Sequence, residues 1–309
     1  MHSFLGATYV KRMKIGYPCI NLTIGCKGDR TFRLKSYSEP RLIETVANNL
    51  DCLERILRWN VERRILFFRL TSDLVPFASH PVCRFDWRGH FREQFTRIGD
   101  FIQGHDIRIS MHPDQFTLIN SLDEGIFERS RRELLYHAHI LDAMGLDETA
   151  RIQIHVGGVY GDREESTRRF VERFRRLDPV IRRRLVVEND EKSYCVQDCL
   201  RIHEEAGVPV LFDAFHHSIF NCGENAHECL ECIAPTWGPR DGVPMVDYSS
   251  QAAGRPVGSH APSIEIEDFR AFLIGSKPFN FDIMLEIKDK EASALKAIVA
   301  AAIDERFIG

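Results

Sequence analysis

From residue 112 onward, histidine, aspartate and glutamate residues stand close behind short apolar runs. The candidate metal ligands are His112, His155, Glu188, Asp213, His216, Asp247, His260 and Glu286. One ion uses three or four protein groups, so a set of this size predicts two or three ions. Imidazole and carboxylate donors without a thiolate suit Mn²⁺ or Zn²⁺ better than Ca²⁺, with Mg²⁺ as a further alternative. Clustered charges without metals would be costly to bury, so a metal centre is the preferred interpretation.

Two adjacent ions suit the hydrolysis of a phosphate ester, because together they activate water and stabilise the leaving oxygen. Glu188 and Glu286 are candidates for carboxylates that bridge two ions and so take part in catalysis. Arg69 and Lys288 are candidate catalytic cations that would stabilise charge on the phosphate. For these two cations an ordinary structural ion pair is the alternative, with Glu286 as a partner of Lys288.

The apolar runs that precede the candidate ligands predict parallel strands, because they are short and almost continuously hydrophobic. Strands are expected at 14–20, 65–71, 107–111, 151–156, 185–187, 208–212, 244–248 and 281–287. Between them, apolar residues recur with a period near 3.6, and helices are expected at 40–59, 88–103, 125–144, 164–177, 196–206, 225–233, 266–273 and 291–307. Eight strand–helix units predict an α/β protein that closes as a (β/α)₈ TIM barrel, whose active site lies at the carboxyl ends of the strands.

The stretch 107–116, IRISMHPDQF, shows how one such strand reaches the site. A residue before proline avoids the α region, so the strand ends in a loop that begins with His112. Gln115 and Phe116 follow three and four residues later, where the loop would hold them over the mouth. The alternative for Phe116 is that its ring packs inward beneath the loop.

Composition limits the class of protein: 44% of the 309 residues are hydrophobic and 28% are charged, as in a globular protein. No linker divides the chain, so we expect one catalytic domain over 14–309 behind a short tail at 1–13. No apolar run reaches the roughly 18 residues of a membrane span, and the tail lacks a secretory signal. We therefore expect a cytoplasmic protein, and a monomer. The net charge of −4 argues against a non-specific nucleic-acid coat.

Nine cysteines in a cytoplasmic protein are expected to be reduced. Cys222, Cys229 and Cys232 suggest a metal or iron–sulfur site, but they supply one C-x-x-C and no second pair, so buried or incidental thiols are preferred. Cys195 and Cys199 are interpreted in the same way. Arginine clusters at 129–132, 168–176 and 182–184 fall on expected helices, where solvated outer faces are preferred over a phosphate-binding stripe.

Nine motifs, in this order and spacing, closely resemble those of the UV damage endonucleases: GYPCIN, FRLTSDLVP, MHPDQF, IHVGG, VVEND, DAFHH, YSSQ, SHA and IMLEIKDKE. The resemblance implies a TIM barrel similar to endonuclease IV, with a manganese-type multi-metal centre. Such enzymes nick double-stranded DNA immediately 5′ of UV photoproducts and leave a 3′-hydroxyl. It also implies that Tyr17, Asn21, Gln115 and Phe116 touch or wedge apart the damaged bases.

The chain departs from this pattern on the strand at 244–248. Met245 and Asp247 stand where members of the family carry a lysine and a histidine. Asp247 can still bind a metal, whereas Met245 cannot carry the carbamate that the lysine sometimes bears. Phe116 stands where a tyrosine can occur, which keeps a stacking face and loses a hydroxyl.

Two other functions fit parts of the pattern. A sugar isomerase or epimerase on such a barrel binds one metal through residues of the fifth to eighth strands, but it leaves His112 and His155 unexplained. A non-catalytic barrel that binds DNA damage is suggested by the departures at Met245 and Asp247. The number of ions per chain separates the first from the nuclease, and a nicking assay separates the second.

Overall fold

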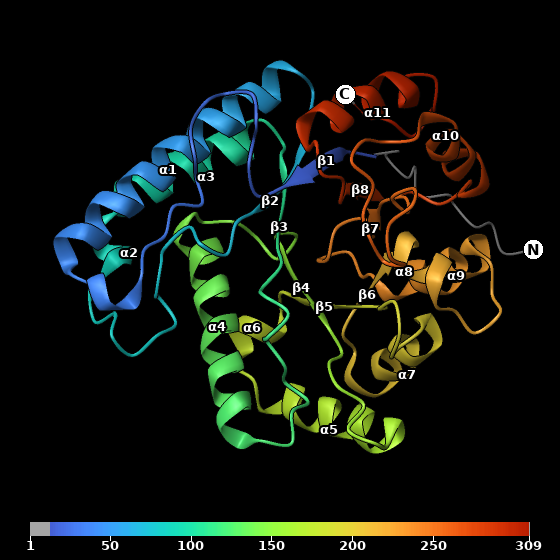
Figure 1. The fold of residues 1–309 in the computed structure, drawn as a ribbon, viewed down its shortest axis with the longest axis horizontal. Coiled ribbons are helices and arrows are strands. Elements are labelled where there is room, and N and C mark those ends of the chain that lie inside the picture. Colours follow the sequence, from blue (N-terminus) through green and yellow to red (C-terminus); the bar gives the residue numbers. More distant parts are fainter. Residues whose placement is uncertain (1–12, 309) are drawn as a thin grey trace, which may run out of the picture.

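The computed structural model describes residues 13–308, so all of the predicted tail except Met13 lies outside the described residues. Eight parallel strands close into a barrel in which each strand pairs with its neighbours in the sequence and β8 returns to β1 (Figure 1). They are β1 (Ile15–Pro18), β2 (Phe67–Leu70), β3 (Arg108–Met111), β4 (Arg151–His155), β5 (Leu185–Glu188), β6 (Val210–Asp213), β7 (Met245–Tyr248) and β8 (Asp282–Leu285). The predicted single-domain TIM barrel is confirmed.

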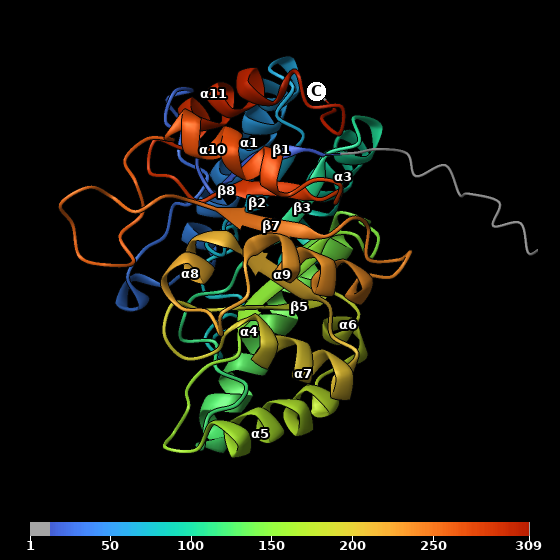
Figure 2. The same ribbon diagram turned by 90° about the vertical axis from the view of Figure 1, so that its right-hand side faces the viewer.

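Helices surround the barrel on its outside (Figures 1 and 2). They are α1 (Glu39–Glu62), α2 (Trp87–His90), α3 (Arg92–Gly104), α4 (Glu124–Ala143), α5 (Arg163–Arg176), α6 (Pro179–Arg182), α7 (Val196–Ala206), α8 (Ala214–Ile219), α9 (Ala226–Ile233), α10 (Ile266–Gly275) and α11 (Glu291–Ala301), with 3-10 turns η1 (Leu34–Ser36) and η2 (Ala234–Thr236). Ser38, Asp123 and Asp162 each cap a helix by accepting a backbone N–H of its first turn. Among the described residues, none of the helices has the length and apolar character to span a membrane.

The structure adds elements that hydrophobic periodicity did not predict. Of these, α8 matters most for the site, because it begins directly behind Asp213 at the end of β6. The Asp213 carboxylate caps α8 by accepting the backbone N–H of His216 at 2.8 Å. A helix of six residues is too short to show a period, so the sequence predicted only a loop here. The helix expected at 88–103 is also divided, at Phe91, into α2 and α3.

The long connection between β7 and α10 forms a projecting hairpin, drawn in orange at the left of Figure 2. Gln251 and His260 pair across it as an antiparallel bridge. The Gln251 side chain organises the tip, since its amide nitrogen donates to the carbonyls of Ala252 and Pro256 and its oxygen accepts the N–H of Gly258 at 2.9 Å. The hairpin therefore holds its shape through its own hydrogen bonds.

The arginine clusters at 129–132 and 168–176 lie on α4 and α5, whereas Arg183 and Arg184 follow the end of α6. The preference for solvated outer faces is wrong for Arg173 and Arg184, which are buried. Several of these arginines form ion pairs. Arg131 pairs with Asp178, Arg168 pairs with Glu165 at 2.7 Å, and Arg184 pairs with Asp142 at 2.8 Å. Cations that already neutralise a carboxylate attract a phosphate backbone less strongly. These pairs favour a structural role over a phosphate-binding stripe.

The expectation that the cysteines are all reduced is wrong for four of the nine. Cys26 is bonded to Cys52, and Cys195 is bonded to Cys222. The partners are 26 and 27 residues apart in sequence, and the fold brings their Cα atoms to 5.8 and 6.4 Å, within the range of a disulfide. Sequence spacing carries no information about such pairings, because long loops create them.

Gly99 is a position where α3 packs so closely on the end of α4 that a side chain has no room. A Cβ atom there would lie 1.7 Å from the carbonyl oxygen of Met144. Gly99→Ala should lower the free energy of unfolding by about 1–3 kcal/mol, the usual effect of overpacking. At roughly 2–4 °C per kcal/mol, calorimetry should record a fall of several degrees in the melting temperature.

Gly104→Ala is the matched control, because Gly104 ends the same helix and its Cβ would meet nothing within 4 Å. It should leave the melting temperature unchanged or raise it slightly. Equal melting temperatures for the two variants would contradict the packing argument.

Candidate metal centre

The register of the barrel sets the candidate ligands side by side at one mouth. His155 is paired with Glu188 across β4 and β5, and Asp213 is paired with Asp247 across β6 and β7. Because all strands are parallel, their carboxyl ends open on the same side of the barrel. The arrowhead of β7 in Figure 2 points toward this mouth.

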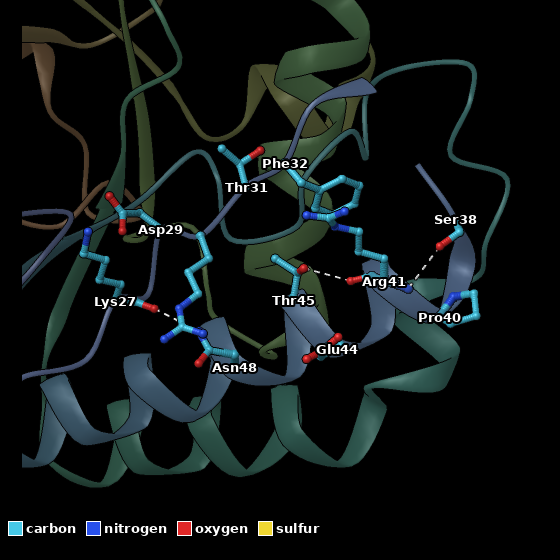
Figure 3. A pocket seen from close by; sticks show the side chains of 11 residues that line it. Lys27, Asp29, Thr31, Phe32, Ser38, Pro40, Arg41, Glu44, Thr45 and Asn48 are labelled. Atoms are coloured by element: carbon cyan, nitrogen blue, oxygen red, sulfur yellow. Dashed lines mark hydrogen bonds between the residues drawn. The ribbon is translucent and has the colours of Figure 1, made fainter. Parts of the chain in front are cut away.

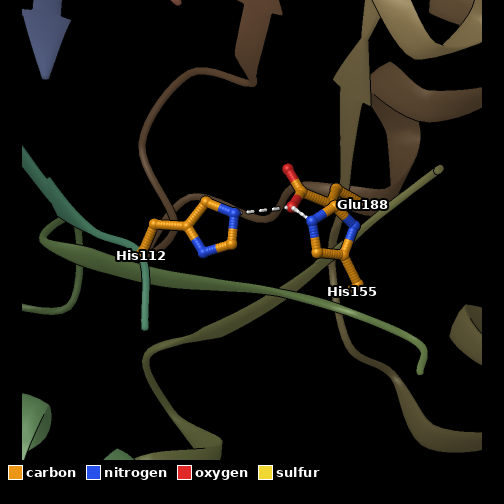
Figure 4. A group of neighbouring side chains, drawn as sticks. All are labelled: His112, His155 and Glu188. Atoms are coloured by element: carbon orange, nitrogen blue, oxygen red, sulfur yellow. Dashed lines mark ion pairs between the residues drawn. The ribbon is translucent and has the colours of Figure 1, made fainter. Parts of the chain in front are cut away.

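His112, His155 and Glu188 converge at the ends of β3, β4 and β5 (Figure 4). The Nε2 atoms of the two histidines lie 2.9 and 3.1 Å from the same oxygen, Oε1 of Glu188. Within the described chain, this buried oxygen and the Nδ1 atoms of both rings make no aligned hydrogen bond. Two imidazole nitrogens that point at one carboxylate oxygen without forming aligned hydrogen bonds suit the ligands of a shared divalent cation.

Glu188 also belongs to a second group of ligands. One oxygen each of Glu188, Asp213 and Asp247 lies within 4.8 Å of the others, and all three residues are buried. Carboxylates this close cannot all ionise in a buried site unless positive charge is added. The two groups share Glu188, so its position suits the bridging role predicted for it.

His216 and His260 approach from α8 and from the hairpin. The Nδ1 atom of His216 lies 3.1 Å from the carbonyl oxygen of Asn189, and Nδ1 of His260 lies 2.7 Å from that of Glu286. A histidine whose Nδ1–H donates to a carbonyl keeps its lone pair on Nε2, which is the usual state of a metal-binding imidazole. The His216 ring lies 5.7 Å from that of His155, so the ligands form one continuous cluster.

Arg69 is buried beneath this cluster, with 3% of its side chain exposed. Its guanidinium pairs with Asp247 at 2.7 Å and with Glu286. The structural ion pair considered for Arg69 therefore exists, whereas Glu286 turns to Arg69 and not to Lys288. Arg69 neutralises part of the carboxylate charge and orients two candidate ligands.

Gln153 is a member of the site that the sequence did not predict. Its amide nitrogen donates to Glu188 and Asp247, both at 2.7 Å, and its oxygen accepts from Arg69 at 2.7 Å. A polar residue two positions before His155 points to the same side of its strand, and that alternation was the signal that could have identified it. Gln153 thereby fixes the relative positions of the two carboxylates.

The surroundings separate the pKa values of these groups. Burial raises the pKa of Asp247 to about 7, although Arg69 opposes this shift. Burial would also raise the pKa of Glu286, but Arg69 and His112 outweigh it and lower the pKa to about 2. Burial would lower the pKa of His216, but Asp213 and the other carboxylates raise it to about 9. Without further positive charge, the cluster therefore retains protons that a bound cation would displace.

The four predicted DNA contacts fall into two classes. Tyr17 and Asn21 are buried and hydrogen-bonded to each other at 2.8 Å, so neither presents its side chain at the surface. Gln115 is exposed, and Phe116 leaves 74% of its surface in solvent. The alternative that Phe116 packs inward is wrong. Lys288 is also exposed, and its catalytic role and the four DNA-contact roles stay predictions.

A hollow of about 900 Å³ lies between the connection that follows β1 and the first turns of α1 (Figure 3). Lys27, Arg30 and Arg41 line it together with Asp29 and Glu44. None of the candidate ligands is among its lining residues. This large hollow is therefore separate from the candidate metal centre.

Comparisons with known proteins agree with this geometry. Residues 13–305 match the family described as UV-endonuclease UvdE. The UV DNA damage endonuclease of Clostridium perfringens (strain 13 / Type A) is 38% identical over 290 residues, which cover 93% of this chain and 70% of the relative. The protein of the same description from Bacillus cereus (strain Q1) is 35% identical over 296 residues, which cover 93% of each.

Solved structures agree at the level of the fold. The crystal structure of SacUVDE is 46% identical, with a TM-score of 0.90 over 94% of this chain and 98% of that one. Endonuclease IV from Thermus thermophilus is 16% identical, with a TM-score of 0.58 over 81% of this chain and 93% of that one, and shares the fold. One conclusion follows from the eight-stranded barrel, from its mouth of histidines and carboxylates, and from the family match over nearly all of the described residues. This chain belongs to the UV-endonuclease UvdE family.

Proposed function

We propose that this protein nicks double-stranded DNA immediately 5′ of UV photoproducts, by hydrolysis that depends on two or three divalent ions, with Mn²⁺ preferred. The observation that carries the proposal is the pair of ligand groups joined by Glu188 at the barrel mouth. The family to which the chain belongs supplies the substrate class. We further propose that the protein acts as a cytoplasmic monomer.

Each residue of the cluster has a role in this proposal. The candidate ligands are His112, His155, Glu188, Asp213, His216, Asp247, His260 and Glu286. Bound divalent ions would activate water and stabilise charge on the departing 3′-oxygen. Arg69 and Gln153 hold Glu188, Asp247 and Glu286 in position through their hydrogen bonds. Lys288, which is exposed and follows Glu286 by two residues, would contact the phosphate.

Damage would be recognised through the ease with which the duplex deforms. A photoproduct weakens base stacking, so bending the DNA and extruding the lesion costs less there than elsewhere. Gln115 and Phe116 follow the ligand His112 on one short loop, and both side chains are exposed. Phe116 offers an aromatic face that could fill the gap left in the stack.

The epimerase alternative rests on the fold alone. A D-psicose 3-epimerase from Clostridium cellulolyticum H10 shares the barrel at 12% identity and a TM-score of 0.52. An enzyme of the single-metal kind gives no role to His112 and His155, which here share an oxygen of Glu188. Metal analysis tests the point.

Elemental analysis of protein reconstituted with Mn²⁺ should find at least two ions per chain, because the two ligand groups overlap only at Glu188. The same protein should convert UV-irradiated supercoiled plasmid to the nicked form and leave unirradiated plasmid intact. One ion or none would contradict the multi-metal proposal. Loaded protein that binds damage without nicking would favour the non-catalytic alternative.

Glu188→Gln and Glu286→Gln each remove a charged ligand while keeping the volume of the side chain. Both should reduce the nicking rate by about 10²-fold or more, the effect expected when a charge at a reacting centre is lost. Glu267→Gln, at an exposed position of α10, is the control and should nick normally. Near-normal nicking with either mouth variant would remove that residue from the proposed site.

Phe116→Ala tests the recognition loop. Loss of a stacking face worth roughly 1–3 kcal/mol should weaken binding to photoproduct-containing duplex by about 5- to 150-fold. The melting temperature and metal content should stay unchanged, because the ring is exposed and is not a ligand. Ile303→Ala removes another exposed apolar side chain, one that follows α11, and should not affect binding. Unchanged affinity for damaged duplex in gel-shift titrations of Phe116→Ala would end the wedge proposal.

A further inference from the structure

A second group of side chains that could bind a metal lies between α8 and α9, apart from the ligands of the barrel mouth. His217 of α8, Glu224 of the connecting loop and Cys229 of α9 each place one donor atom within 4.8 Å of the others. His217 and Cys229 are buried, with 7% and 1% of their surface exposed. Imidazole, carboxylate and thiolate, here from three separate segments, are all ligand types that Zn²⁺ takes in proteins.

The distances suit one ion. The Cys229 Sγ atom lies 3.7 Å from Nδ1 and 3.9 Å from Nε2 of His217. Bonds of about 2.3 Å to sulfur and about 2.0 Å to nitrogen at a tetrahedral angle separate the two ligand atoms by roughly 3.6 Å. Because the sulfur is almost equally far from both nitrogens, the His217 ring must rotate to aim one of them at an ion that the thiolate also reaches.

Glu224 supplies an independent observation. Its Oε2 atom accepts the N–H of Cys222 at 3.1 Å, whereas Oε1 is buried and has no hydrogen-bond partner in the described chain. A buried carboxylate oxygen without a partner is costly, and an ion held by His217 and Cys229 would satisfy it.

We propose that His217, Glu224 and Cys229 bind one Zn²⁺ ion that is distinct from the ions of the barrel mouth. Three protein ligands leave the fourth tetrahedral position to water, which the half-buried Glu224 allows. The ion would join α8 to α9 and brace a helix of only six residues, too short to be stable by itself. Because His216 precedes His217 on that helix, the brace would hold one mouth ligand in place.

Cobalt substitution tests the site separately from the mouth. Metal-free protein is titrated with Co²⁺ without reductant, so that both disulfides stay closed. A thiolate ligand produces a near-ultraviolet charge-transfer band, which histidines and carboxylates do not. The wild-type protein should show this band, Cys229→Ser should lose it, and Glu224→Gln should need more than about tenfold higher Co²⁺ to develop it.

Two variants serve as controls. Cys232→Ser removes an exposed thiol one turn further along α9 and should keep the band. Glu188→Gln alters the mouth and should also keep it, so failure of the nuclease proposal and failure of this one are distinguishable. Absence of the band in wild-type protein, or its persistence in Cys229→Ser, would overturn the proposal. If Cys229→Ser does not fold, the result for Glu224→Gln, whose residue lies in a loop, decides.

Discussion

Repulsion among buried carboxylates at the barrel mouth is the constraint around which the rest of the site is arranged. Glu188, Asp213 and Asp247 lie within a few ångströms of one another, and the only buried arginine or lysine that pairs with them in the described chain is Arg69, through Asp247. Divalent ions would stabilise the remaining charge and displace the protons that the cluster retains without them. The metals are therefore expected to contribute to stability as well as to catalysis.

The pairing of Arg69 with Asp247 also bears on the departure from the family pattern on β7. A carboxylate here is held by a guanidinium and by Gln153, which a histidine at this position could not engage in the same way. Met245, which precedes it by two residues, is fully buried and apolar. Protein groups thus balance part of the charge on this side of the mouth. Asp247 already pairs with Arg69 before any metal is bound.

Much of this architecture could be predicted from the sequence, for physical reasons. Strands buried on both faces are almost continuously apolar, and the active site of a barrel lies at their carboxyl ends. His155, Glu188 and Asp213 could therefore be placed at the barrel mouth from their positions in the sequence alone. Contacts that depend on three-dimensional packing could not. The contacts of Gln153, the pairing of Cys195 with Cys222 and the opposite directions of His216 and His217 arise only when strand register and the short helix α8 are formed.

The hairpin between β7 and α10 connects an exposed tip to a candidate metal ligand. Its tip carries Arg255 and Val257 beyond the strand ends, and His260 stands on its returning arm, paired with Gln251. The Gln251 side chain bonds to the tip, and its backbone pairs with His260, so the tip and this candidate ligand belong to one hydrogen-bonded unit. A contact between the tip and a substrate would therefore bear on the position of His260 beside Glu286.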